Sequence, residues 1–163
     1  MTDAIDPLTF RRTLGHYPTG VCAITSVDNT GAPVAMIVGS FTSVSLDPPL
    51  VAFFPDKGST SWPKIQASGR FCVNVLADDQ EELCRVLASK GPDKFDRAPH
   101  QLLDSRTPIL DGALLWIDCS LYAVHEAGDH YIAIGRVGAL EVGRAAPPLI
   151  FHKGRYGKVA EPL

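Results

Sequence analysis

Four hydroxyl side chains occupy positions 40 to 45, and a rigid turn follows them. The hydroxyls belong to Ser40, Thr42, Ser43 and Ser45, and the turn is Asp47-Pro48-Pro49. Hydroxyls that alternate with backbone N–H groups can line the pocket of a polar ligand such as a phosphorylated cofactor. Each proline fixes φ and removes an N–H, so the turn ends the loop. Composition alone favours the simpler alternative, a Ser/Thr-rich turn that only satisfies its own backbone.

A second segment, residues 125–130, holds two histidines and two carboxylates. Its order is His125-Glu126-Ala127-Gly128-Asp129-His130, and these are typical metal-ligand types. A zinc-binding HExxH motif needs its histidines one helical turn apart, whereas these are five apart and separated by a glycine, so we expect no metal. A hairpin turn would instead hold Asp129 and His130 side by side at the start of a strand. This pair is the best candidate for chemistry.

The elements that must position these segments are mainly strands. The turn at residues 28–31 joins the first two strands, with Gly31 free to adopt positive φ. Residues 91–112 contain three prolines and little periodicity, which predicts a long loop. Apolar and β-branched runs predict strands over residues 21–27, 34–38, 50–54, 70–76, 116–124 and 131–142.

Three short helices are predicted from the signals at their ends. The first spans residues 6–15, from an aspartate cap to a glycine. The second begins at a hydroxyl cap within residues 59–61 and ends at Gly69. The third begins with a capping box in which Asp78 is the cap and Glu81 lies three residues further on.

The order of the predicted elements indicates the fold class. Many strands, three short helices and the lack of βαβ alternation argue against a doubly wound α/β sheet. The pattern favours a mainly β fold, an antiparallel β-barrel decorated with short helices. The chain has 163 residues and no evident linker, so we expect a single domain over residues 1–163.

Composition and charge exclude several classes of protein. The content is 45% hydrophobic and 20% charged, which is typical of a soluble globular chain rather than a disordered one. The formal charge is −3 and the basic residues are scattered, so we expect no nucleic-acid partner. No apolar stretch is long enough to span a bilayer, and the N-terminus lacks the pattern of a signal peptide. We therefore expect a cytoplasmic protein without a membrane partner.

The cysteines and glycines match no familiar cofactor motif. The four cysteines show no CxxC spacing, and we interpret them as small buried apolar residues in a reducing compartment. No GxGxxG follows a strand, and Gly154-Arg155-Tyr156-Gly157-Lys158 does not have the spacing of a P-loop. A nucleotide cofactor would therefore have to be held by the loops of a barrel.

Four segments are more informative in their order than any of them is alone. They are Tyr17-Pro18-Thr19-Gly20-Val21, then Ser40-Phe41-Thr42-Ser43-Val44-Ser45-Leu46-Asp47-Pro48-Pro49-Leu50-Val51, then Phe71-Cys72-Val73-Asn74-Val75-Leu76, and then Gly128-Asp129-His130. Asp79-Gln80-Glu81-Glu82-Leu83 and Asp93-Lys94-Phe95 follow the third segment. In this order the chain resembles the short-chain flavin reductases, the reductase components of two-component flavin monooxygenases. The resemblance runs roughly from Phe10 to Tyr156.

The resemblance implies a fold and an activity. The fold is the flavin-binding split barrel, which in this family forms a homodimer. The activity is hydride transfer from NADH or NADPH to FMN or FAD, after which reduced flavin diffuses to a partner monooxygenase. Two alternatives remain: a flavin-binding split barrel without nicotinamide-dependent reductase activity, and a barrel that has lost flavin and serves as an interaction subunit.

The resemblance also implies which residues form the site. Asn74 and Phe95 are expected near the flavin, although a structural hydrogen bond and a plain loop anchor are the respective alternatives. His130, beside Asp129, is expected to orient the nicotinamide rather than to act as an acid or base, because hydride transfer is the cofactors' own chemistry. The phosphate is expected at Lys57, Ser59 and Ser61, where helix capping is the alternative role of the serines. The flavin ring and ribityl chain are expected to contact Ile37, Val38, Gly39, Ser40, Ser43, Val44 and Ser45.

The chain departs from the family pattern at three of these positions. Ile37 lacks the hydroxyl of the usual threonine, Gly39 lacks a polar side chain, and Gly58 stands where many relatives have serine. Each missing side-chain hydrogen bond is worth about 0.5–1.5 kcal/mol. The departures would therefore weaken flavin binding, which suits an enzyme that uses flavin as a substrate.

Overall fold

The computed structural model describes residues 4–160. Its elements in chain order are α1 (Pro7–Leu14), β1 (Thr19–Gly20), β2 (Cys22–Val27), β3 (Pro33–Val38), β4 (Thr42–Leu46), β5 (Pro49–Phe53), α2 (Trp62–Ser68), β6 (Arg70–Val75), η1 (Asp78–Gln80), α3 (Glu81–Ala88), η2 (Lys94–Arg97), β7 (His100–Leu102), β8 (Pro108–Leu110), β9 (Leu115–Ala127), β10 (His130–Val142), β11 (Leu149–His152) and β12 (Arg155–Lys158). Within this range, no helix has both the length and the apolar character needed to cross a membrane.

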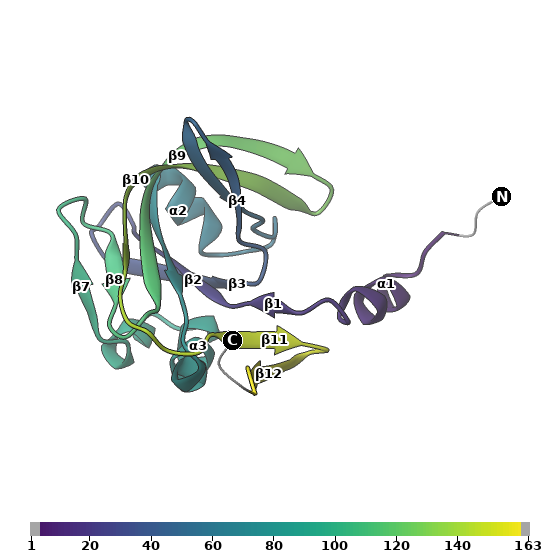
Figure 1. Ribbon diagram of the computed structural model, residues 1–163. Helices are drawn as coiled ribbons and strands as arrows, with labels where there is room; N and C mark the ends of the chain where they lie inside the picture. The colour runs from purple at the N-terminus through teal and green to yellow at the C-terminus, as the bar shows by residue number, and fades with distance from the viewer. Residues whose placement is uncertain (1–3, 161–163) are drawn as a thin grey trace.

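A curved antiparallel sheet forms the body of the protein. Its strands lie in the order β3-β2-β6-β9-β10-β5-β4, and every neighbouring pair is antiparallel. Between β9 and β10 the register shifts twice, at Ile134/Gly135 and at Val137/Ala139. Such bulges increase the local twist, and Figure 1 shows these two long strands arching over the other elements. This mainly β, antiparallel architecture with short helices confirms the predicted fold class.

Two smaller sheets flank the main one. The first has the order β1-β11-β12 and ties the segment after α1 to the C-terminal strands. The second is the β7–β8 hairpin. In Figure 1, α1 projects from the body on the side of β1. The C-terminal end of α1 therefore contacts the turn between β11 and β12. This contact contributes to the site described below.

The core consists of two clusters on opposite faces of β3. Val34 and Val38 belong to a cluster that contains the α2 residues Trp62 and Ile65, whereas Ala35 belongs to a second cluster beneath α3. The strand is apolar along its length because both of its faces are covered. Removing each large side chain from water contributes about 1.5–3 kcal/mol. The edge of β3 is thus held rigidly between two helices.

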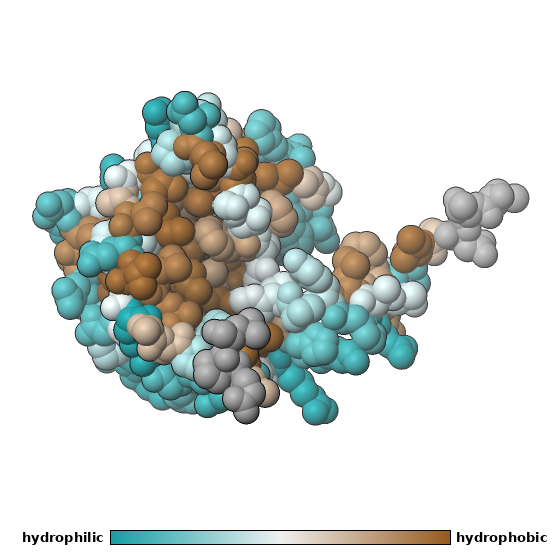
Figure 2. Space-filling view, in the orientation of Figure 1, coloured by the Kyte–Doolittle hydropathy of each residue, from teal (hydrophilic) through white to brown (hydrophobic). Residues whose placement is uncertain are grey.

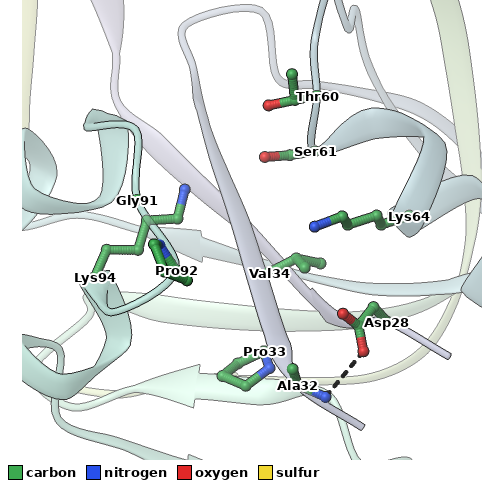
Figure 3. A pocket seen from close by; sticks show the side chains of 10 residues that line it. All are labelled: Asp28, Ala32, Pro33, Val34, Thr60, Ser61, Lys64, Gly91, Pro92 and Lys94. Atoms are coloured by element: carbon green, nitrogen blue, oxygen red, sulfur yellow. Dashed lines mark hydrogen bonds between the residues drawn. The ribbon is translucent and has the colours of Figure 1, made fainter. Parts of the chain in front are cut away.

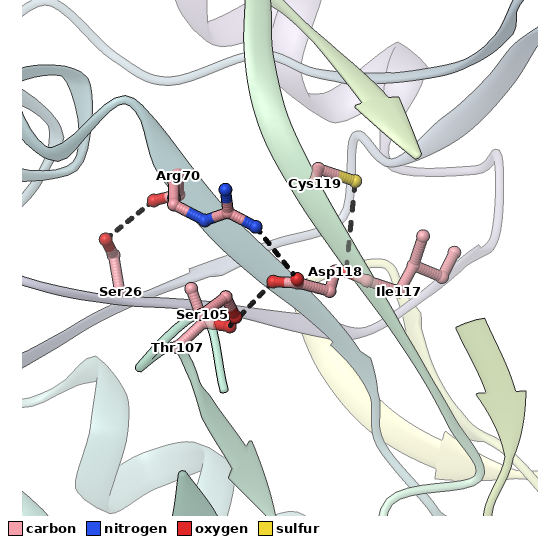
Figure 4. Close-up of polar contacts among 7 residues, drawn as sticks. All are labelled: Ser26, Arg70, Ser105, Thr107, Ile117, Asp118 and Cys119. Carbon is pink, nitrogen blue, oxygen red and sulfur yellow. Dashed lines mark hydrogen bonds and ion pairs between the residues drawn. The ribbon is translucent and has the colours of Figure 1, made fainter. Parts of the chain in front are cut away.

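A buried carboxylate fastens the β7–β8 hairpin to the main sheet. Asp118 of β9 accepts a hydrogen bond from Thr107 Oγ1 at 2.7 Å and one from an Arg70 guanidinium nitrogen at 3.2 Å. Figure 4 shows the two partners on either side of the carboxylate, with Ser105 beside Thr107. The prediction of a long loop over residues 91–112 is wrong in part, because η2, β7 and β8 lie within it.

The hydroxyl-rich segment is mostly a strand rather than a loop. β4 pairs with β5, with Thr42 opposite Ala52 and Ser43 opposite Val51. Threonine and valine favour extended backbone, and the turn after Leu46 folds the segment back onto β5. As β4 is the last strand of the sheet, one of its edges stays open.

Most predicted helix ends are confirmed, but the capping box is not where we expected it. Asp6 accepts hydrogen bonds from the N–H groups at the start of α1, and Gly69 ends α2 with φ 69°. The third helix is preceded by the 3₁₀ turn η1, in which the Gln80 side chain accepts from the Ala77 N–H at 3.0 Å. Asp78 lies inside this turn, so it does not cap the helix.

Candidate functional site

A pocket of about 500 Å³ lies where β3, the end of α1 and the β9–β10 hairpin meet. It brings the predicted residues Ile37, Val38, Gly39 and Ser40 together with His130. These residues come from β3, the turn after it and the first position of β10, which are far apart in the sequence. Sequence reasoning did not assign the other main lining residues, Tyr17, Thr19, Met36, Phe54, Asp56 and Phe151.

His130 is held by acidic neighbours at the edge of this pocket. Its Nδ1 lies 2.7 Å from Asp129 Oδ1, and its Nε2 lies 3.9 Å from Asp56 Oδ2. A carboxylate can only accept, so Nδ1 carries the hydrogen of this bond. The hydrogen bond and the nearby imidazole hold the pKa of Asp129 below its usual value. The His130 side chain remains 41% exposed, so one edge of a fixed ring is available to a ligand.

Gly39 allows a close approach that no other residue would. A Cβ at this position would lie 2.7 Å from Thr19 Oγ1. The Thr19 hydroxyl is buried and has no hydrogen-bond partner among the residues described, although Thr19 itself lines the pocket. A side chain at position 39 would therefore require Thr19 to shift. Ser40 Oγ accepts from the Phe54 N–H at 3.0 Å, which leaves the Ser40 hydroxyl proton free to donate.

A neighbouring hollow, also of about 500 Å³, continues toward β4. It shares Thr19, Gly39 and Ser40 with the first pocket and adds Phe41 and Thr42. Three other predicted flavin contacts, Ser43, Val44 and Ser45, lie further along β4 and line neither hollow. Their place on an edge strand separates them from the part of the turn that meets His130.

A third pocket, of about 370 Å³, lies at the other end of β3. Figure 3 shows Lys64 and Lys94 directed toward it from α2 and from the segment after α3, with Thr60 and Ser61 nearby. The Lys94 ammonium donates to the carbonyls of Ala35 and Leu87, each at 3.0 Å. Burial, with the charge of Lys64 adding to it, lowers the pKa of Lys94. Two cations next to hydroxyls suit an anion, although the Asp28 carboxylate lines the same pocket and offsets part of the charge of Lys64.

The three residues predicted to bind the flavin phosphate do not lie in one site. Lys57 lies beside the β9–β10 hairpin, where its ammonium is 3.4 Å from Glu126 and 5.4 Å from the centre of the Tyr131 ring. Ser59 caps α2, because its hydroxyl oxygen accepts from the N–H groups of Ser61 and Trp62. Of the three residues predicted for the phosphate, only Ser61 reaches the pocket that contains Lys64 and Lys94.

Asn74 and Phe95 are buried among other residues of the protein rather than exposed in a pocket. Asn74 is fully buried, donates to Ala23 O and Thr25 Oγ1, and accepts from the Leu110 N–H. These three bonds favour the structural alternative over the expected contact with flavin. Phe95 is 8% exposed and packs in the cluster beneath α3, which makes it a core anchor.

The residues described contain no cluster of side chains arranged to hold a metal ion. All four cysteines are buried and unpaired, which agrees with their interpretation as small buried apolar residues. Burial raises the pKa of Cys22, Cys72 and Cys119 to about 12, so none of these thiols is a nucleophile at neutral pH.

Some of the unassigned pocket residues had a signal in the sequence and others had none. Thr19 stands in the Tyr17-Pro18-Thr19-Gly20-Val21 segment, one of the four that carried the family resemblance. Lys64 and Lys94 stand 30 residues apart and meet only through the packing of α2 and η2, so no local pattern pairs them.

Comparison with known proteins places the chain in a family. Residues 14–160 match the model of the flavin reductase like domain. A flavin reductase from Pseudomonas putida is 56% identical, over 96% of this chain and 92% of that protein. The reductase subunit HsaB of a flavin-dependent monooxygenase from Rhodococcus jostii is 48% identical, over 94% of this chain and 78% of that protein.

A solved structure shares the fold closely. The NADH:FAD oxidoreductase SgcE6 of Streptomyces globisporus, in complex with NAD and FAD fragments, superposes with a TM-score of 0.89 at 33% identity, covering 98% of each chain. The match to the family model spans most of the chain and includes β3, its turn and the β9–β10 hairpin. The chain belongs to the family of flavin reductase-like domains.

Proposed function

We propose that this protein transfers hydride from a reduced nicotinamide nucleotide to a flavin bound along the edge of β3. The observation that carries this proposal is the pocket in which the backbone of residues 37–40 meets the fixed ring of His130. The pocket walls fit a flavin because they combine apolar side chains with the free proton of Ser40 and the unpartnered hydroxyl of Thr19.

The flavin phosphate is assigned to the pocket that contains Lys64 and Lys94. β3 joins this pocket to the one that contains His130, because Val34 lines the first and Met36 lines the second. An elongated ligand on β3 can therefore place its ring at one end and its phosphate at the other. Lys57 is a weaker candidate for the phosphate because Glu126 already pairs with it.

His130 positions the hydride donor. The bond from Nδ1–H to Asp129 fixes the plane of the imidazole, and the exposed ring edge can contact the nicotinamide carboxamide or ring face. When bound, the flavin supplies the acceptor atom for the hydride. The contribution of this chain is to align the two rings and to exclude water from between them, with Phe54 and Phe151 as apolar walls.

NADH is the donor we propose, and an oxygenase is the proposed recipient of reduced flavin. The name of the Streptomyces globisporus relative specifies NADH and FAD, and that of the Rhodococcus jostii relative specifies a monooxygenase reductase subunit. Neither pocket has a feature that distinguishes the phosphate of FMN from the pyrophosphate of FAD. The pocket itself therefore favours neither flavin.

A second copy of the chain is the proposed partner for an exposed apolar face. Figure 2 shows apolar residues gathered over the region where Figure 1 places β4, β9 and β10. On these strands Leu46 is 97% exposed, Val142 73% and Leu140 64%. Large apolar patches on folded domains mark protein interfaces. Light scattering of the purified protein tests this, and a monomer at micromolar concentration would contradict it.

The activity is tested by following oxidation of NADH and NADPH with FMN and then FAD. We expect consumption that depends on added flavin and is faster with NADH. Flavin binding is measured separately, by quenching of flavin fluorescence. Protein that binds flavin yet oxidises neither nucleotide would contradict the proposed function.

A further inference from the structure

A basic cleft of about 350 Å³ lies beside the pocket that contains His130. Arg11, Arg12, His16 and Lys153 line it, together with two glycines. No carboxylate lines it. Among residues 4–160, the side chains of Arg11, Arg12 and Lys153 form no ion pair. A concave surface with several cations and no acid attracts an anionic ligand.

Backbone contacts build this cleft from two distant segments. The turn between β11 and β12 is tied to the end of α1, because the Lys153 N–H donates to Gly15 O at 2.8 Å. His152 Nε2 lies 3.2 Å from His16 O, which adds a second contact between the same segments. His16 Nδ1 in turn lies 3.0 Å from Arg12 O. The fold thus brings Lys153 beside the adjacent Arg11 and Arg12.

The cleft is continuous with the pocket where hydride transfer is proposed. Gly15, Lys153 and Gly154 line both. The charge of Arg11 is among the influences that lower the pKa of Asp129, the partner of His130, so its field reaches the tip of the β9–β10 hairpin. A ligand whose ring lies against His130 can therefore extend into the basic cleft without leaving the protein surface.

We propose that this cleft binds the pyrophosphate of a dinucleotide whose reactive ring lies against His130. The inference rests on the proposed function, since that function places a nicotinamide and a flavin in the adjoining pocket. Two dinucleotides carry this group, NADH and FAD. The phosphate of FMN is assigned instead to the pocket with Lys64 and Lys94, at the other end of β3.

The first test measures binding directly, without turnover. ADP-ribose carries the pyrophosphate and adenosine that both dinucleotides share, but no nicotinamide or flavin ring. Its dissociation constant is measured by calorimetry for the wild type and for Arg12→Gln and Lys153→Asn. Asparagine is chosen because Lys153 has φ 50°, a conformation that asparagine tolerates. Each variant is expected to bind roughly three- to tenfold more weakly, as partly exposed charged contacts do.

The matched control is Arg97→Gln. Arg97 is an exposed arginine that pairs with Glu82 at 3.2 Å and lines none of the pockets described here. Its loss changes the net charge as Arg12→Gln does, so an equal effect would mean only a general charge effect. Such equality, or ADP-ribose affinity that is unchanged in all variants or undetectable in the wild type, overturns the proposal. Circular dichroism spectra that match the wild type establish that each variant is folded.

Kinetic arms distinguish the two dinucleotides. If NADH occupies the cleft, Arg12→Gln raises the KM for NADH three- to tenfold but leaves the KM for reduced nicotinamide mononucleotide unchanged. If FAD occupies the cleft, Arg12→Gln weakens the binding of FAD but not the binding of FMN. Equal weakening of FMN and FAD would place the flavin phosphate in the cleft and overturn the assignment.

Failure of this inference is separable from failure of the proposed function. A wild-type enzyme that oxidises NADH with flavin, paired with variants whose constants for NADH, FAD and ADP-ribose do not change, refutes the cleft alone. A wild type without flavin-dependent oxidation refutes the function, and the ADP-ribose measurement still decides the cleft.

Discussion

Polar side chains occur in two regions of the same sheet, and they differ in what remains available to a ligand. Asn74 of β6 and Asp118 of β9 are buried within the sheet, where protein partners occupy their polar atoms. Ser40 and His130 lie at the ends of strands and keep a donor or a ring edge free at the surface of a pocket. The difference indicates that burial within the sheet, rather than residue type, decides whether a polar group is available to a ligand.

The largest expected effect comes from the buried region. Asn74→Ala leaves the Leu110 N–H without its partner and empties the site of the amide, which costs about 2–4 kcal/mol in the free energy of unfolding. Urea denaturation measures this change. The folded fraction is expected to retain normal turnover with NADH and flavin. Turnover lost at unchanged stability would return Asn74 to the flavin site and break the distinction between the regions.

The next effect comes from the pocket, with the opposite signature. His130→Ala is expected to slow hydride transfer roughly 10²-fold, because the donor ring loses its positioning contact. Stability should change by less than about 0.5 kcal/mol, since the side chain is partly exposed. Stopped-flow absorbance with preformed flavin complex measures the step.

His125→Ala is the matched control for this variant, as an exposed histidine on the same hairpin. Equal rates in the two variants would exclude the role of His130 and leave the pocket without a positioning residue.

A smaller effect is expected at the far end of β3. Lys64→Met should lower the affinity for FMN roughly tenfold. The affinity for riboflavin, which lacks the phosphate, should not change. Lys57→Met should have little effect on either flavin, and the reverse order would favour the original prediction for Lys57. Fluorescence quenching measures all four affinities.

A pH dependence accompanies that prediction. The pKa of Lys94 is lowered by burial and by Lys64, so its ammonium loses its charge at a lower pH than an ordinary lysine. Affinity for FMN is therefore expected to be greatest at lower pH and to fall as pH rises through this lowered pKa. The ratio of FMN to riboflavin affinity isolates the phosphate contribution, and a ratio that stays constant up to the ordinary lysine value of 10.5 would contradict the prediction.

The smallest effect is expected from Asp129→Asn. The amide oxygen can still accept from His130 Nδ1–H, so hydride transfer should slow only about two- to fivefold. The lowered pKa of Asp129 means that its carboxylate stays charged below the pH at which an ordinary carboxyl group is protonated, and the charge is lost only as pH falls through the lowered value. The wild-type rate should therefore fall at acid pH more steeply than the rate of the variant.

Local patterns predicted the elements better than the site. Asp6 and Gly69 act on neighbouring backbone, so their roles could be inferred from adjacent residues. The hydroxyls of β4 were expected in a loop because their partner strand, β5, follows only after the turn. Asn74 was expected to be free to contact flavin because its hydrogen-bond partners, Thr25 and Leu110, are distant in sequence.

The family resemblance supplied what local patterns did not. It brought residues 37–40 and His130 together, and the structure places them in one pocket. It did not predict that Lys64 and Lys94 line the same pocket, because two cations that are brought together by tertiary packing form no recognisable sequence motif. It also implied that Gly39 lacks a contact with flavin, whereas in the structure a side chain at this position would first require Thr19 to shift. The individual roles of these residues stay predictions until the variants are measured.

The burial of the thiols has a consequence for an enzyme that handles reduced flavin in air. Reduced flavin that escapes its acceptor reacts with dioxygen and yields hydrogen peroxide, which oxidises thiolates rather than thiols. With a pKa of about 12 for Cys22, Cys72 and Cys119, about one thiol in 10⁵ is ionised at pH 7. The protein is thereby protected from its own by-product, and its lifetime during uncoupled turnover should not depend on a cellular reductant.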